Sequence, residues 1–346
     1  MFWNNMRWLN LKILALWGLI GWVLVSCNNS FADTITRPST QALSSPPGDY
    51  IDVAWLEGNL FAFEYAPRQS NRMPDYQVTL YASDANDWRI MPVHKPDECT
   101  SVWNEGPVQR LPNGNLGFLH WCSLKSHGEY ETLYMWDRQT GRLQVLQRYP
   151  REFFPANYTF APQMSGLIQE NAVGPKLSNQ LYRVEQNGQM ERILSNFQRA
   201  QAPSWSSDGH TIAFLGTETY PGGDPGEFTA LGQIADLATY PWDIYLMDAD
   251  GGNVRLVLPG ITDTGILKWS PNSRVLAFVG TYRDAGGIWL LDVETSQVTR
   301  IWPSRAGFDW SPDGRQMVVL PWKSDGRGNR EPIQPVIIDV PSEVGN

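Results

Sequence analysis

The residues best suited to metal or acid–base chemistry are few and scattered along the chain. The four histidines stand at positions 94, 120, 127 and 210. His94 and His127, with Asp97 nearby, are the best candidates for a metal site, but no regular ligand spacing joins them. His210 follows a turn and reads as an ordinary strand residue. We therefore expect no metal.

The acids give no clear catalytic pair either. The candidates lie in the long stretches between predicted strands: Glu98, Glu105, Glu152, Asp284 and Asp325. No spacing rule pairs any two of them as a general acid and a general base. The stretch DADGG, 248–252, lacks the downstream acids of a calcium loop. The sequence has no glycine-rich phosphate loop. We expect no cofactor and, on balance, a protein that is not an enzyme.

The first residues read as an export signal. Arg7 and Lys12 precede an uncharged apolar run, 13–25, which is shorter than the roughly 20 residues that a membrane span needs. The following LVSC resembles the lipobox of bacterial lipoprotein precursors. That resemblance implies removal of residues 1–26 and acylation of Cys27, giving a membrane-anchored lipoprotein of the bacterial cell envelope. The alternative is an ordinary signal peptide with an incidental cysteine.

The charge of the chain limits its partners. Loss of residues 1–26, which hold two basic residues and no acid, changes the formal net charge from −9 to −11. An acidic domain without a basic stripe repels the phosphates of nucleic acids. We expect no nucleic-acid partner, and contact with the membrane only through the lipid on Cys27.

The elements that position all these residues come from a sixfold repeat. In its clearest copies, such as DWSPDGRQMVVL, a strand ends at Trp and turns through Ser-Pro-Asp-Gly into a second strand. We call the Trp position the slot, and its six occupants are Trp55, Arg110, Phe160, Trp205, Trp269 and Trp310. A second phrase follows each slot, as in LYMWD, IYLMD and IWLLD, and becomes PVIID in the last copy.

Each pair of phrases predicts four antiparallel strands. In the turn, Pro presets φ, Asp caps the loop and Gly adopts the conformation that other residues avoid. Six such units over residues 50–340 predict an all-β protein, a six-bladed β-propeller, with a short tail at 341–346.

The WSPDG phrase with IY-x-x-D downstream resembles the WD-repeat-like propeller repeat of the TolB C-terminal domain. The resemblance covers roughly residues 50–340 and is clear in the last three copies but degenerate in the first three. The family also includes peptidase-linked propellers and pectin-degrading lyases. The sequence has no G-x-S-x-G motif and no histidine cluster like that of the lyases, and we expect no separate N-terminal α/β domain like that of TolB. The resemblance therefore implies the fold and leaves TolB's role in doubt.

Loop lengths distinguish two faces of this propeller. The turns between strands 1 and 2 and between strands 3 and 4 are short, whereas the other connections are long, at 93–107, 122–130, 148–156, 217–241 and 322–334. Long loops on one face favour binding there, although tolerated drift would give the same pattern. Cys99 and Cys122 both fall on this face in one blade, so we expect a disulfide rather than two free thiols.

The loop 217–241 is the longest of these connections. Trp205 and Tyr245 are 40 residues apart, whereas the corresponding positions in other blades are 20 to 26 apart. The loop carries apolar residues that a solvated segment seldom gathers: Tyr220, Phe228, Leu231, Ile234 and Tyr240. We expect a contact surface for a partner, formed by either a short helix or a mobile loop.

The last copy lacks a fourth strand. We expect the stretch DTITR, 33–37, to pair on its outer edge, because an open edge promotes association. The rest of 27–49 would then be a short link to the anchor. The alternative is that the whole segment is a free tether.

Three functions remain open at this point. The first is an envelope scaffold that binds a protein or peptide through the long-loop face. The second is a binder of a glycan or small molecule in the channel mouth, and the third is a carbohydrate-active enzyme with acids at the channel. The lack of a catalytic constellation favours the first.

Overall fold

The computed structural model describes residues 39–43, 49–66, 77–83, 87–91, 99–104, 107–124, 128–149, 154–173, 178–185, 188–218, 241–324, 330–332 and 334–341. The chain divides into two units, 1–34 and 35–346, and every described residue belongs to the second. In this described part, no helix has the length and apolar character needed to cross a membrane.

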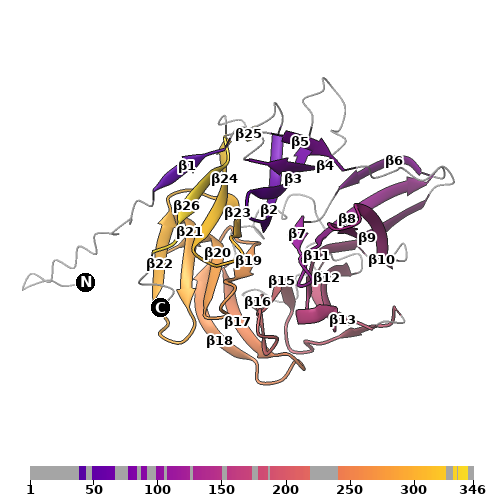
Figure 1. The fold of residues 1–346 in the computed structure, drawn as a ribbon. Coiled ribbons are helices and arrows are strands. Elements are labelled where there is room, and N and C mark those ends of the chain that lie inside the picture. The colour runs from indigo at the N-terminus through magenta and orange to yellow at the C-terminus, as the bar shows by residue number, and fades with distance from the viewer. Residues whose placement is uncertain are drawn as a thin grey trace, which may run out of the picture. The chain divides into compact units, whose positions relative to one another are not determined.

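Six antiparallel sheets form a ring, and each sheet is one blade (Figure 1). Each blade has four strands that follow one another from the inside of the ring outward, apart from the exceptions given below. The helical content of the described residues is a single 3-10 turn, Pro162–Met164. The prediction of an all-β, six-bladed propeller is confirmed.

Blades 4 to 6 follow the repeat closely. Blade 4 consists of β15 (Arg199–Trp205), β16 (Thr211–Thr217), β17 (Trp242–Asp248) and β18 (Arg255–Ile261). Blade 5 consists of β19 (Leu267–Trp269), β20 (Val275–Tyr282), β21 (Ala285–Asp292) and β22 (Val298–Trp302). Blade 6 contains β23 (Ala306–Trp310), β24 (Gln316–Ser324) and β26 (Val336–Asp339), with β25 (Arg330–Pro332) paired to β24. In all three blades the slot Trp ends the first strand.

Blades 1 to 3 have the same order with more irregular strands. Blade 1 consists of β2 (Asp49–Glu57), β3 (Leu60–Ala66), β4 (Gln77–Ala82) and β5 (Asp87–Ile90). Blade 2 splits its inner strand into β6 (Cys99–Asn104) and β7 (Gln109–Arg110), followed by β8 (Leu116–Leu124), β9 (Gly128–Asp137) and β10 (Arg142–Arg148). Blade 3 consists of β11 (Phe154–Phe160), β12 (Leu167–Val173), β13 (Ser178–Val184) and β14 (Met190–Arg192).

An N-terminal strand completes blade 6. This strand is β1 (Thr40–Ala42), which pairs antiparallel with β26 on the outer edge of the sheet. Just beyond it, the Leu43 N–H donates to the Pro335 carbonyl at 2.8 Å, and the Leu43 side chain is buried. The stretch 33–37, for which this role was predicted, lies outside the described residues.

The Ser that follows the slot Trp holds the first turn of blades 4 to 6. In blade 6, the Ser311 hydroxyl donates to the Asp313 carboxylate at 2.7 Å and accepts the Gln316 N–H at 2.9 Å. Gly314 completes the turn at φ 72°, in the left-handed region that favours glycine. The same two hydrogen bonds recur in the other two blades, on Ser206 with Asp208 and Thr211, and on Ser270 with Asn272 and Val275. This network explains why the phrase repeats.

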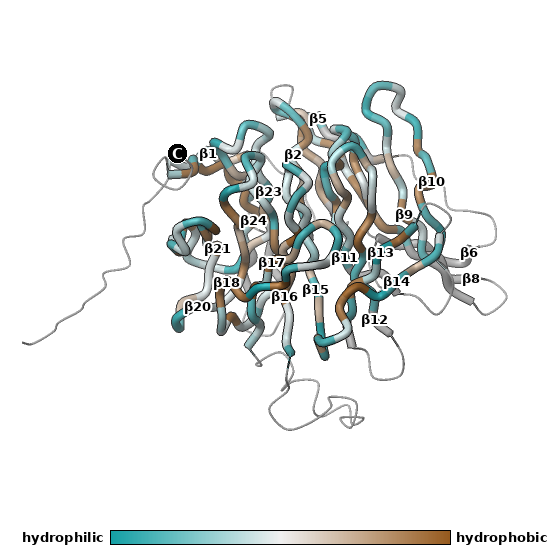
Figure 2. The backbone as a smooth tube through the Cα atoms, turned by 90° about the horizontal axis from the view of Figure 1, so that it is seen from below, coloured by the Kyte–Doolittle hydropathy of each residue, from teal (hydrophilic) through white to brown (hydrophobic). Residues whose placement is uncertain are grey.

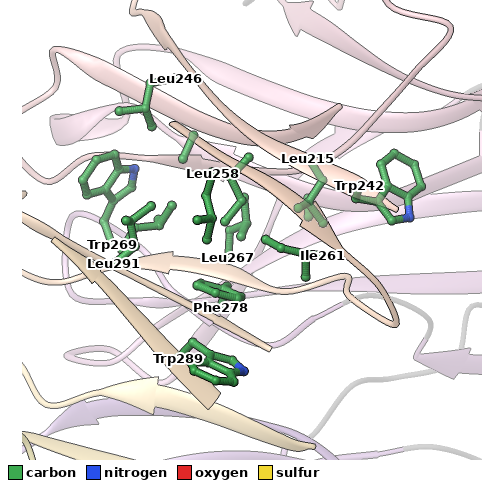
Figure 3. Packing of buried hydrophobic residues seen from close by; sticks show 14 residues of the cluster. Leu215, Trp242, Leu246, Leu258, Ile261, Leu267, Trp269, Phe278, Trp289 and Leu291 are labelled. Carbon is green, nitrogen blue, oxygen red and sulfur yellow. The ribbon is translucent and has the colours of Figure 1, made fainter. Parts of the chain in front are cut away.

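The core lies between neighbouring blades, where the faces of their sheets meet. Between blades 4 and 5, Leu215 and Ile261 pack with Trp269, Phe278 and Trp289 (Figure 3). Phe278 and Trp289 are stacked, with ring centroids 6.4 Å apart. Hydrophobic residues follow the strands and hydrophilic residues concentrate in the turns (Figure 2). Large buried side chains of this kind each contribute roughly 1.5–3 kcal/mol to stability.

Candidate binding site

A cavity of about 480 Å³ lies among the inner strands. Its lining comes from β2, β7, β11, β15, β19 and β23, which are the innermost strands of the blades in Figure 1. The short turns after these strands also contribute, with residues such as Pro112, Gln163 and Ser207. The described cavity therefore lies toward the short-turn face. The long loops, on which the sequence placed binding, fall largely outside the described residues.

Hydrogen bonds between neighbouring blades form the cavity wall beside the slots. The indole N–H groups of Trp269 and Trp310 donate to the carbonyls of Ser204 and Lys268 at 3.0 and 3.1 Å. Each accepting residue stands directly before the slot residue of the preceding blade along the chain. In blades 3 and 4, the Trp205 N–H donates to the Thr159 hydroxyl at 2.9 Å. These bonds satisfy backbone groups that the inner strands cannot pair within their own sheets.

Blades 1, 5 and 6 bring three charged groups into this wall. Lys268 Nζ lies 3.4 Å from an Asp309 carboxylate oxygen, and the other Asp309 oxygen accepts the Trp55 N–H at 2.8 Å. Asp52 is buried and accepts the Val53 N–H at 2.8 Å. Burial raises the pKa of Asp52 to about 6, although the charge of nearby Lys268 lowers it. Asp52 is therefore mostly ionised at neutral pH.

A third acid, Glu170, supports the wall from the second strand of blade 3. Its carboxylate accepts the Asn157 side-chain N–H at 2.7 Å and the Ala202 N–H at 2.8 Å. Burial raises the pKa of Glu170, and these hydrogen bonds lower it in part. Asn157 and Ala202 line the cavity, so Glu170 acts as a positioning residue for the wall.

The remaining wall is less charged. Blades 3 and 4 contribute Tyr158, Phe160 and Trp205, and blade 2 contributes Gln109 and Arg110. A cavity of this size, with apolar surface and a few fixed polar groups, has the features of a binding pocket. The arrangement can hold either a small molecule or a short stretch of an extended chain.

The described histidines do not contribute to a metal site. His120 is buried in β8, and burial lowers its pKa to about 4, so it is neutral at physiological pH. His210 is exposed in a turn, whereas His94 and His127 lie outside the described residues. Within the described ranges, no three or more His, Cys, Asp or Glu residues gather as metal ligands would.

The predicted site residues fall almost entirely elsewhere. Cys27 and the apolar group in the loop 217–241, namely Tyr220, Phe228, Leu231, Ile234 and Tyr240, lie outside the described residues. In blade 2, the register places Cys99 opposite Leu124 and Cys122 opposite Val102. The two cysteines are therefore not directly opposite each other, and the ladder has a bulge between Cys99 and Ser101. Their bridge stays a prediction.

Sequence reasoning missed the charged wall. Lys268 and Asp309 each stand directly before a slot Trp, and Asp52 stands three residues before one. The residue before the slot lines the cavity in five of the six blades: Gln109, Thr159, Ser204, Lys268 and Asp309. Alignment of the six phrases at that position would have identified these residues.

Solved structures share this fold, although no protein-family model matches the chain and the comparison with curated proteins found no match. TolB from Acinetobacter baumannii has a TM-score of 0.51 at 14% identity, over 77% of this chain and only 60% of that one. A putative TolB from Agrobacterium tumefaciens has a TM-score of 0.50 at 17% identity, over 75% and 88%. An oligogalacturonate lyase from Vibrio parahaemolyticus has a TM-score of 0.53 at 12% identity, over 91% and 96%. In fold, this chain is a TolB-like β-propeller.

Proposed function

We propose that this protein is a membrane-anchored binding protein of the bacterial cell envelope, which holds a segment of a protein partner in its central cavity. The observation that carries the proposal is the cavity of about 480 Å³ with Asp52, Lys268 and Asp309 in its wall. Fixed charges in a pocket orient a ligand and give specificity. The predicted lipid on Cys27 would keep the cavity at the membrane, next to other envelope proteins.

The arrangement of the inner strands favours a peptide as the ligand. The innermost strands β2, β11, β15, β19 and β23 are each the edge of a sheet, so each has one side without a strand partner. Hydrogen bonds between blades use some backbone groups on that side, such as the Trp205 N–H and the Ser204 carbonyl. An extended peptide can bind such edges through its backbone while its side chains enter pockets. The loop 217–241 stays a predicted second contact with the partner.

Site-specific crosslinking tests this function. A photo-reactive phenylalanine in place of Gln163 or Ser207, both exposed in turns beside the cavity, should capture an envelope protein in intact cells. The same residue in place of Val145 or Leu256, which are 46% and 50% exposed on outer strands, is the matched control and should not. Equal capture from all four positions, or none from the first two, would contradict binding at the cavity.

The anchor has its own test. Cells fed an alkyne fatty acid should label the wild-type protein and leave Cys27→Ala unlabelled. Equal labelling of both proteins would overturn the lipoprotein proposal without affecting the cavity.

The second candidate is a glycan or small-molecule binder, or a carbohydrate-active enzyme. It is supported by the cavity volume, which falls within the range of about 300–1,000 Å³ typical of small-molecule pockets, and by the fold shared with an oligogalacturonate lyase. Incubation with oligogalacturonides tests it. Unsaturated products that are lost in Asp309→Asn would favour this candidate over the peptide.

A further inference from the structure

The charges in the cavity are unevenly distributed. Asp52 and Asp309 contribute two carboxylates to the wall made by blades 1, 5 and 6, and Lys268 contributes one ammonium. When all three groups are ionised, this part of the wall has a net formal charge of −1. A single ammonium 3.4 Å from one Asp309 oxygen leaves the second carboxylate without a cationic partner of its own.

Asp52 is held in place by backbone groups. Its carboxylate accepts the Val53 N–H at 2.8 Å, and the Val108 N–H also faces it. Asp52 is only 8% exposed, so water screens the charge of its carboxylate weakly. A cation that entered the cavity would interact strongly with this carboxylate.

Asp309 also retains capacity for a ligand. One oxygen accepts the Trp55 N–H at 2.8 Å, and the other is near Lys268. A carboxylate has about four acceptor positions, so these contacts do not exhaust it. Both acids therefore present acceptors in one wall of the same cavity.

We propose that the central cavity recognises a positively charged group of the partner peptide, a Lys or Arg side chain or a free amino terminus, at Asp52 and Asp309. This inference rests on the proposed peptide-binding function and names the chemistry of its ligand. The net charge of −9 for the whole chain points the same way, because it attracts a basic ligand over a long range.

Arg110 supplies a comparison of opposite sign in the same cavity. It lies in blade 2, in the slot that Trp occupies in four other blades, and lines the cavity. Among the described residues, no carboxylate lies within ion-pair distance of it. Since its charge repels a cation, Arg110→Gln should strengthen the binding of a basic ligand, whereas Asp52→Asn and Asp309→Asn should weaken it.

The test is calorimetric titration of capped tripeptides, acetyl-Ala-X-Ala-amide with X as Lys, Arg, norleucine or Glu. A fifth probe, Ala-Ala-Ala-amide with a free amino terminus, separates the terminus from a side chain as the source of the charge. We expect at least one cationic probe to bind about 10-fold or more tightly than the norleucine peptide, and to lose that advantage in Asp52→Asn and Asp309→Asn. The Asn side chains keep an oxygen for the backbone N–H donors, and thermal unfolding confirms that each variant is folded.

Four results would overturn the inference. The first three are equal binding of the norleucine peptide and every cationic probe, preference for the glutamate peptide, and an unchanged advantage of the cationic probe in both Asp variants. The fourth is absence of binding by every probe. Crosslinking from Gln163 and Ser207 judges the proposed function separately, so a captured partner with no preference for charge would leave peptide binding in place.

Discussion

The interface between blades 2 and 3 and the interface between blades 5 and 6 bury different kinds of side chain. Eight of the buried polar residues in the described part belong to blades 2 and 3, whereas three belong to blades 5 and 6. Those three, Ser270, Asp292 and Ser311, all stand at turns or strand ends. Between blades 5 and 6 the strands instead bring together Phe308, Trp310 and other apolar residues. The two interfaces have the same architecture but different contents.

Between blades 2 and 3, buried side-chain amides lie next to the apolar cluster. Leu167 packs in the cluster with Leu133. Gln169 and Asn171 alternate with Leu167 along β12 and so share its face, and both are 0% exposed. Neither amide has a hydrogen-bond partner among the described residues. A buried amide without a partner costs about 1–3 kcal/mol.

This difference between the interfaces explains why the repeated phrase is clear in some blades and degenerate in others. Each blade pairs its strands within its own sheet, so the ring can tolerate a polar interface without losing a blade. The clear copies of the phrase occur where apolar slots fill the interfaces, in blades 4 to 6. In two of the three degenerate copies, those of blades 2 and 3, Arg110 or Phe160 replaces Trp and polar side chains are buried. In these two blades a weak repeat marks an interface with other contents, and not a missing blade.

The largest expected effect comes from the slots themselves. Trp310 is 2% exposed and donates to Lys268 from its indole, so Trp310→Ala should lower the free energy of unfolding by about 3–5 kcal/mol. Phe160→Ala, at the half-buried slot of blade 3, should lower the free energy of unfolding by about half as much or less. Urea unfolding measures both. Equal losses would mean that the two slots contribute alike to stability.

The pH dependence of stability compares a buried acid with an exposed one. Burial raises the pKa of Asp52 from 3.8 to about 6, so its stabilising effect is complete below pH 3.8 and is lost as the pH rises through 6. From pH 4 to pH 7, wild type should therefore lose on the order of 3 kcal/mol relative to Asp52→Asn.

Asp313, in an exposed turn of blade 6, should behave with the opposite sign. Hydrogen bonds from Ser311 and Arg315 lower its pKa, so its contribution is present above the ordinary aspartate pKa and is lost as the pH falls. Urea unfolding of Asp52→Asn and Asp313→Asn across this pH range measures both trends. Parallel trends would contradict the contrast between the two environments.

The amides of blade 3 give a smaller effect with an unusual sign. Gln169→Leu should raise the free energy of unfolding by about 1 kcal/mol, because it removes a buried amide that has no partner among the described residues. The reverse change between blades 5 and 6, Met317→Gln, should lower it clearly, since Met317 is 0% exposed in an apolar cluster. Destabilisation by Gln169→Leu would show that this amide is paired in solution.

The smallest effects lie in the turns. Gly314 has φ 72°, a left-handed conformation that strains a residue with a Cβ atom. Gly314→Ala should therefore lower the free energy of unfolding by about 1 kcal/mol. The corresponding residue of blade 5 is Ser273, at φ 60°, and its hydroxyl accepts the Asp208 N–H at 2.9 Å. Ser273→Gly should change stability by less than about 0.5 kcal/mol, because relief of strain offsets the lost hydrogen bond. Thermal unfolding distinguishes the two variants.

Much of the fold was predictable because its signals are local. Ser311, Asp313 and Gly314 form their turn within one phrase, through hydrogen bonds and a preferred φ that need no distant partner. The slots could likewise be read from spacing alone. The charge of the cavity wall was not evident in this way. Alignment of the six phrases marks the position before each slot, but Lys268 and Asp309 look there like ordinary polar residues beside a Trp.

The sequence by itself determined the number of blades, the ends of most first strands and the chemistry of the turns, because each depends on residues close together in the chain. Only the tertiary structure decided which N-terminal residues complete blade 6, where Thr40 pairs with Ile338. It also decided that the Trp55 N–H meets the Asp309 carboxylate and that Lys268 lies beside the first blade. These contacts join residues more than 200 positions apart, and they exist only because the ring closes and brings the N-terminal part of the chain next to its last two blades.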